Sequence, residues 1–249
     1  MPCPGTPDGA IALPGEGNQA ITLRTDGLHE FYAAGKSDAA ACNGLAFLML
    51  HLRQREDTRP AVWLRETGAA RSLGHPYGPG LVELTGAVSL PQRITLIALP
   101  DPAAVLRAAL DCARDGSLSA VLIELAGRQP LLDLTSSRRF ALAAAASDTM
   151  ILIARGPARP VPSAAHTRWQ IAAAPSAALA AKASGAPAFA LDLLRRRGGR
   201  DGLRFILEWN RDTTSFRLRN GPAADTPLSR PASAVAFGGT GDSRRSRAA

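Results

Sequence analysis

The tripeptide Gly35-Lys36-Ser37 matches the end of a phosphate-binding loop, whose full pattern is Gly-x-x-x-x-Gly-Lys-Ser/Thr. In that pattern the glycines let the backbone wrap the phosphates, the lysine neutralises them and the hydroxyl binds Mg²⁺. The first glycine should stand at position 30, where this chain has Glu30, and Gly27 comes three residues too early. A carboxylate at the mouth of the loop would repel phosphates. We therefore interpret the tripeptide as a helix N-terminus capped by Ser37, with a weak capacity for anions.

The segment before the tripeptide also argues against nucleotide chemistry. A phosphate-binding loop follows a buried strand, whereas "ITLRTDGLHEFYAA" (21–34) carries Asp26, Gly27 and His29 where that strand should run. His29 and Glu30 would need further ligands to hold a metal ion, and we find none in the sequence. We expect no metal and no cofactor.

Two glutamates end candidate strands, as the catalytic acids of nucleoside triphosphatases do. Glu66 follows "AVWLR", where a water-activating carboxylate could lie. Glu124 is the next-to-last residue of "SAVLIEL", where a magnesium-binding acid is usual. A glutamate at a strand end is more commonly a solvated cap or an ion-pair partner. Without a complete phosphate loop, we expect hydrolysis at neither residue.

Apolar patterning predicts the elements that position these residues. Short apolar runs alternating with amphipathic segments indicate a mainly parallel sheet with helices on both faces. We predict buried strands at 61–66, 93–99, 119–125 and 149–155, and helices over 37–57, 101–116 and 133–147. Gly, Pro and Asp turns then separate strand-like runs at 167–176, 188–197, 203–210 and 214–220, which we expect to extend the sheet as antiparallel strands.

Composition excludes several classes of protein. With 249 residues, 46% hydrophobic and 20% charged, the chain suits a globular α/β protein. Its three cysteines, Cys3, Cys42 and Cys112, form no Cys-x-x-Cys pair, so we expect a reducing cytoplasm rather than disulfides or zinc. The N-terminus has no signal-peptide pattern, and the apolar region 140–154 is too short to span a bilayer, so we expect no membrane contact.

The whole excess of basic over acidic residues lies in the C-terminal part of the chain. Residues 1–150 hold 13 Lys and Arg against 15 Asp and Glu, whereas residues 151–249 hold 16 against 6. Such asymmetry favours nucleic acid or an acidic protein surface as partner. The alternative is a solvated basic surface in an arginine-rich protein.

The order of these elements resembles the recombinase core of RecA, and more specifically the ImuA family of RecA-like proteins. The resemblance covers about residues 28 to 210. It is carried, in order, by "LHEFYAA", "RPAVWLRE", "YGPGL", "DLTSSRRFALAAAAS", "AAHTRWQIAAAPS" and "LDLLRRRGGR". It implies a RecA-like domain, which we place at 27–220. Composition predicts a flexible leader before it (1–26), rich in Pro and Gly, and a disordered basic tail after it (221–249).

The resemblance also implies a function. ImuA-type proteins act without catalysis in the SOS response, in error-prone translesion DNA synthesis. Their implied partners are an ImuB-type homologue of Y-family polymerases and an error-prone C-family DNA polymerase, with RecA and single-stranded DNA as further candidates. The alternatives are a DNA-stimulated ATPase with a degenerate loop around Lys36, and an SOS inhibitor of cell division, which would cause filamentation on overexpression without DNA damage.

Arginines are the candidate contacts to a DNA backbone or to these partners. By the resemblance, one pair lies beside RecA's first DNA loop and three arginines flank the second. A further four surround a Gly-Gly turn between two predicted strands, a pattern that suggests a protruding basic hairpin. In that order they are Arg138 and Arg139; Arg155, Arg159 and Arg168; and Arg195, Arg196, Arg197 and Arg200.

Each candidate has a purely structural alternative. Arg138 and Arg139 could pair with Asp133 or Asp148 at helical distance, and the hairpin arginines could be a solvated tip. Trp169 could stack on a base, although core packing is favoured.

Overall fold

The computed structural model describes residues 11–13, 21–86, 93–176, 185–199 and 201–219. The predicted tail (221–249) and most of the predicted leader (1–26) lie outside them. Within the leader, β1 (Ile11–Leu13) and β2 (Ile21–Leu23) pair as an antiparallel two-stranded sheet.

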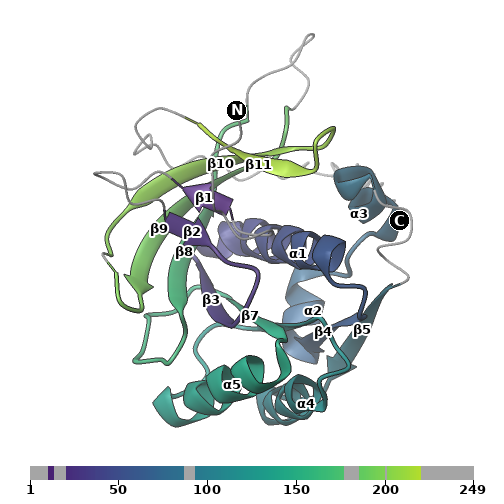
Figure 1. Ribbon diagram of the computed structural model, residues 1–249, viewed down its shortest axis with the longest axis vertical. Helices are drawn as coiled ribbons and strands as arrows, with labels where there is room; N and C mark the ends of the chain where they lie inside the picture. The colour runs from purple at the N-terminus through teal and green to yellow at the C-terminus, as the bar shows by residue number, and fades with distance from the viewer. Residues whose placement is uncertain (1–10, 14–20, 87–92, 177–184, 200, 220–249) are drawn as a thin grey trace, which may run out of the picture.

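Nine strands of the described chain form one sheet, which confirms the predicted α/β class (Figure 1). Their order is β11-β10-β9-β8-β3-β7-β6-β4-β5. The strands are β3 (Leu28–Ala33), β4 (Ala61–Glu66), β5 (Ile94–Leu99), β6 (Ala120–Leu125), β7 (Met150–Arg155), β8 (Thr167–Ala173), β9 (Ala188–Arg196), β10 (Arg204–Asn210) and β11 (Ser215–Leu218). Strands β3 to β8 pair in parallel, and β9 to β11 add antiparallel neighbours.

Three expectations about the strands are corrected. The segment 28–33 is a buried strand at the centre of the sheet, although its polar residues argued against one. Strand β8 runs parallel to β3, not antiparallel, and only its other neighbour, β9, is antiparallel. Strand β5 forms as predicted but lies at the sheet edge, where most of its residues are exposed rather than buried.

Helices cover both faces of the sheet, as the alternation of elements predicted. Helix α1 (Ala39–Glu56) packs on one face, with Phe47 and Leu48 against Trp63, Leu122 and Leu152 in one apolar cluster. Helices α4 (Pro102–Asp115) and α5 (Leu134–Ser147) lie side by side on the other face (Figure 1). The shorter α2 (Thr67–Leu73) and α3 (Gly78–Thr85) lie between β4 and β5 in the chain. None of these helices is both long and apolar enough to cross a bilayer.

Helix ends follow local chemistry, with one correction. The Asp101 carboxylate accepts from Ala104 N at 2.7 Å, and Gly116 ends α4 in the left-handed conformation, both as predicted. Helix α1 does not start at Ser37. A single 3-10 turn over Lys36–Asp38 comes first, and Asp38 is the N-cap residue without a capping bond from its own side chain.

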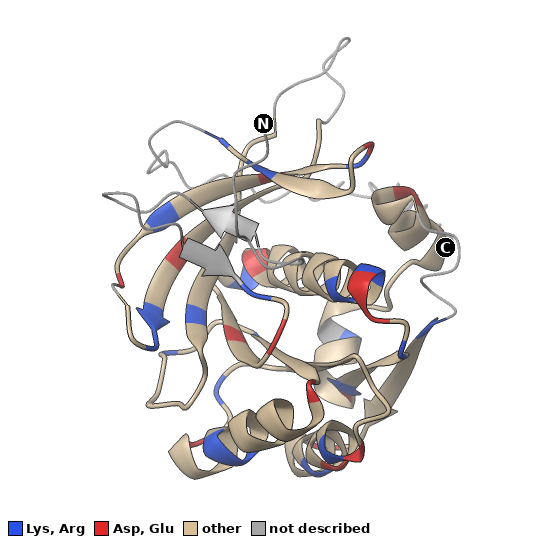
Figure 2. Cartoon of the chain, viewed as in Figure 1, with Lys and Arg blue, Asp and Glu red and all other residues tan. Residues whose placement is uncertain are grey.

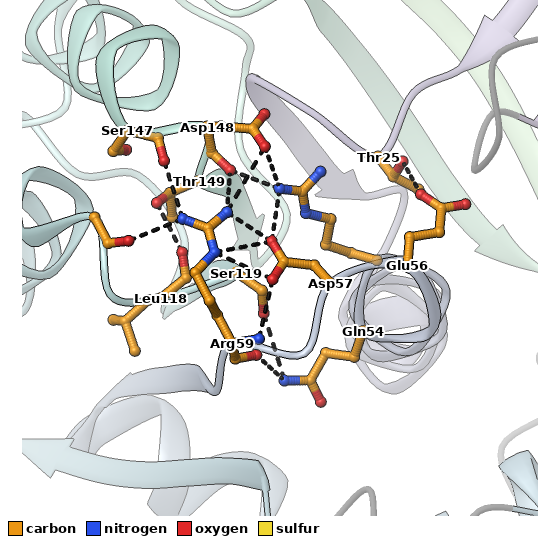
Figure 3. Close-up of polar contacts among 12 residues, drawn as sticks. Thr25, Gln54, Glu56, Asp57, Arg59, Leu118, Ser119, Ser147, Asp148 and Thr149 are labelled. Carbon is orange, nitrogen blue, oxygen red and sulfur yellow. Dashed lines mark hydrogen bonds and ion pairs between the residues drawn. The ribbon is translucent and has the colours of Figure 1, made fainter.

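A cluster of arginines and aspartates ties the helices together at the amino ends of the parallel strands (Figure 3). Arg59 donates to the Gly116 carbonyl at the end of α4 and to the carbonyls of Ser147 and Asp148 at the end of α5. Its guanidinium also bonds Asp57. A cation at two helix C-termini complements both helix dipoles, so this edge of the sheet is a structural one. It also accounts for Asp148, which was considered as a partner of Arg138 and Arg139.

Candidate functional site

The position of the Gly35-Lys36-Ser37 tripeptide is that of a phosphate-binding loop. It follows β3, which lies between β7 and β8 at the centre of the sheet, and it precedes α1. Ligands of open α/β sheets bind at this carboxyl edge. Glu30, however, does not lie at a loop mouth: it is in the middle of β3, fully buried. The strand occupies the positions that the loop needs.

The connection from β3 to the helix is too short to enclose a phosphate. Ala34 N still donates to Ile171 O of β8 at 2.8 Å, and Gly35 has an extended backbone. The 3-10 turn begins at the next residue, so Ala34 and Gly35 alone separate strand and helix. Backbone N–H groups therefore cannot form the cradle that holds phosphates in such loops. The side chains of Lys36 and Ser37 are exposed.

The helix N-terminus already faces a carboxylate. The Oδ1 atom of Asp38 accepts from Ala173 N, at the end of β8, at 3.0 Å. Its Oδ2 atom lies 3.2 Å from where a Cβ on Gly35 would stand. This charge repels a phosphate at the place where the helix dipole would attract one. Ser37 does not cap the helix, so this part of our interpretation is wrong, but the anion site that the interpretation allowed is also blocked.

The acid in the magnesium position is held by the protein itself. Arg65 of β4 forms a bidentate ion pair with Glu124 of β6. Its Nε donates to Oε2 at 2.6 Å, and a terminal nitrogen donates to Oε1 at 2.8 Å. Trp63 Nε1 also donates to Oε2, at 2.9 Å. Arg65 and Glu124 are both about 2% exposed or less. Both carboxylate oxygens are thus bonded to the guanidinium cation of Arg65, which confirms the ion-pair alternative for Glu124.

Glu66, the second acid, is used at the same edge. It ends β4, and its Oε2 accepts from Ala126 N, just beyond β6, at 3.2 Å. The bond caps the end of the neighbouring strand, which is the structural role considered for it. No group of three or more His, Cys, Asp or Glu side chains able to hold a metal ion occurs among the described residues.

Arg155 was a candidate DNA contact, but its side chain is buried. One terminal nitrogen donates to the Tyr32 hydroxyl at 3.1 Å and lies 4.0 Å from Glu30 Oε2. Burial raises the pKa of Tyr32 to about 12, with the negative charge of Glu30 as a second cause. Arg155 is therefore unavailable to a DNA backbone. Its positive charge compensates the buried negative charge of Glu30.

The segment between β7 and β8 is held by hydrogen bonds to the sheet and to α5. Ser163 donates to Glu30, and Ala164 N donates to the Ser137 hydroxyl of α5 at 3.0 Å. Arg168 donates to the carbonyl of Val161 at 2.6 Å, so this candidate contact supports the loop instead of projecting from it. Arg159 in the same segment is exposed.

The remaining arginines divide into two groups. Arg138 of α5 meets Arg195, Arg196 and Arg197 at the end of β9, around one groove. Figure 2 shows basic residues on α5 and at that end of β9. Arg139 is exposed on α5 outside the groove lining, and Arg200 lies outside the described residues. Neither Arg138 nor Arg139 forms an ion pair with Asp133 or Asp148. Asp133 caps α5, and Asp148 bonds Arg53.

Trp169 belongs to the core, as favoured. It is fully buried, packs against Phe205 with ring centres 6.2 Å apart, and donates to the Thr167 hydroxyl at 2.7 Å. It cannot stack on a base.

Comparison with known proteins identifies the fold. No protein-family model matches the chain, and no curated protein matches its sequence. Among solved structures, a crystal structure of the RadB recombinase superposes with a TM-score of 0.50 at 12% sequence identity, covering 74% of this chain and 88% of that one. The chain has a RecA-like fold. At this identity the likeness concerns the fold alone.

Two features of the site were missed from the sequence. One is the Arg65–Glu124 pair, and its signal was an arginine inside a buried strand, since such a charge needs a partner. The other is the apolar wall of the groove. Its signal was a second apolar stripe on α5, at Leu134, Leu142 and Ala145, besides the stripe that packs on the sheet.

Proposed function

We propose that this protein is a non-catalytic, RecA-like accessory factor of SOS-induced translesion DNA synthesis that acts by binding other macromolecules. The RecA-like fold supports a role connected with DNA, and the ordered motifs that resemble the ImuA family favour translesion synthesis. The partners proposed on that resemblance are an ImuB-type polymerase homologue and an error-prone C-family polymerase.

The pairing of Arg65 with Glu124 is the observation that best supports a non-catalytic role. A nucleoside triphosphatase needs a phosphate cradle and a free acid for Mg²⁺. Here the strand end replaces the cradle, and a buried guanidinium holds the acid. Releasing Glu124 for a metal ion would leave Arg65 buried and unpaired, which is strongly unfavourable.

Deleting the gene in its own host is expected to abolish mutation induced by ultraviolet light and to leave homologous recombination unchanged. The reason is that an accessory factor of error-prone synthesis is needed for mutagenesis and not for strand exchange. The measurement is the frequency of induced mutants, with the yield of recombinants scored in the same strains.

Complementation provides the matched controls. Wild-type protein and the exposed-lysine variant Lys36→Ala are both expected to restore mutagenesis, because no phosphate contact depends on that lysine. Mutagenesis that persists in the deletion strain would refute the proposed function.

A further inference from the structure

A groove of about 550 Å³ separates α5 from the end of β9. Residues 163–166, which precede β8, also line the groove. One wall is a stripe of α5 that includes Leu134, Arg138 and Leu142, and the other is the stretch 195–198. The volume is within the range of sites that hold a ligand, about 300–1,000 Å³.

The α5 wall is apolar and unpartnered. The helix already buries Phe140, Ala143 and Ala144 against the sheet. Its second stripe faces the groove instead, and there Leu142 is 66% exposed and Leu134 43%. Two exposed leucines about two helical turns apart on one face, beside a concave surface, are consistent with a protein-binding site.

The rim is basic. Arg138 stands on one side, and Arg195, Arg196 and Arg197 stand on the other. No Asp or Glu lines the groove, and within the described chain none of these four side chains has an ion pair or side-chain hydrogen bond. The complementary partner is therefore acidic as well as apolar.

Shape and composition select one kind of occupant. The groove-lining end of β9 pairs with β8 through Arg195 and Arg196, whereas its register with β10 ends at Asp192, so β8 occupies one of its two edges. The α5 wall from Leu134 to Ala145 is about 17 Å long, which matches about three turns of a helix. The lining has no Phe, Tyr or Trp, and its one aromatic ring is that of His166. The chain's own residues 220–249 carry four Arg and two Asp, the wrong sign for this rim.

We propose that this groove binds an acidic amphipathic helix of a partner protein, with leucine-type side chains against Leu134 and Leu142 and carboxylates toward the four arginines. This is the helix-in-groove mode of recognition. The inference rests on the proposed function in so far as both require a protein partner, but it specifies the surface and the chemistry of the contact.

The test uses the full chain and three labelled synthetic peptides of about 16 residues, long enough to cover the wall. All carry leucines at i, i+3, i+4 and i+7; the other positions are Glu and Ala, Gln and Ala, or Lys and Ala. Fluorescence anisotropy should show saturable binding of the acidic peptide that weakens with salt, weaker binding of the neutral one and none of the basic one. Failure of the acidic peptide to bind saturably overturns the proposal.

Matched variants locate the contact. Leu142→Gln and Arg138→Gln are each expected to weaken binding of the acidic peptide ten-fold or more. Leu131→Gln and Arg139→Gln change residues of the same type and similar exposure outside the groove lining, and are expected to leave binding unchanged.

Two further outcomes would also overturn the proposal. One is equal loss in the lining variants and in their controls. The other is that the lining variants lose binding to oligo-dT but still bind the acidic peptide, which would make the groove a DNA-binding surface. Since these measurements use purified components, their failure leaves the result on induced mutagenesis standing, and the two proposals can fail separately.

Discussion

Replacing Arg65 by methionine is expected to lower the free energy of unfolding by about 3–5 kcal/mol, because it leaves the Glu124 carboxylate buried without its cation. The guanidinium makes two bonds to that carboxylate, at 2.6 and 2.8 Å, and water reaches neither partner. Denaturant unfolding followed by tryptophan fluorescence measures the difference.

Two controls separate this account from a general loss of packing. The double variant Arg65→Met, Glu124→Gln removes both charges and keeps an acceptor for Trp63 Nε1, so it is expected to regain most of the loss. Arg211→Met removes the exposed pair between Arg211 and Glu83 and should cost less than about 1 kcal/mol. A loss for Arg65→Met as small as that for Arg211→Met would mean that Glu124 is accessible, as a metal-binding acid must be.

Replacing His51 by leucine is expected to raise stability below pH 6 and to flatten its dependence on pH. His51 lies in α1 within the core, its ring edge-on to Trp209, and neither ring nitrogen has a hydrogen-bond partner in the described chain. Burial lowers the pKa of His51 to about 4, and the positive charge of Arg55 adds to the effect.

The sign follows from the folded pKa lying below the unfolded value. His51 takes up a proton near pH 6.5 in the unfolded chain and only near pH 4 in the folded chain. The free energy of unfolding is therefore highest above pH 6.5 and decreases as the pH falls from 6.5 to 4. The difference corresponds to about 3 kcal/mol. Part of the dependence should remain in the variant, because burial also lowers the pKa of His29 to about 4.

Unfolding free energies at pH 7.5 and pH 4.5 measure the effect. Replacement of the exposed His75 by asparagine is the matched control and is expected to leave the pH dependence unchanged. Equal slopes for wild type and His51→Leu would contradict the buried, neutral state of this histidine.

The sequence predicted the positions of helices and strands better than it predicted the partners of their buried polar residues. Runs such as 119–125 and 149–155 were identified correctly because a strand buried on both faces is apolar throughout. Strand β3 was missed because its polar residues, His29 and Glu30, find some of their hydrogen-bond partners far along the chain, at Thr167 and Ser163. Local patterning cannot reveal such compensation.

The candidate site could be predicted only in part. The lack of the first loop glycine was visible in the sequence, and it indicated correctly that the cradle is incomplete. The fate of Glu124 was not visible, because the strand that carries Arg65 becomes its neighbour only when the sheet forms. The same holds for Arg155, which periodicity alone could not distinguish from an exposed arginine at the start of a loop.

Phosphate release from ATP, measured with Mg²⁺ and single-stranded DNA on wild type and Lys36→Ala side by side, tests the central claim most directly. Closure of the nucleotide site by the strand end, Asp38 and the Arg65–Glu124 pair predicts no turnover above background for either protein. Turnover in the wild type that disappears in Lys36→Ala would contradict this account and would make the chain a DNA-stimulated ATPase.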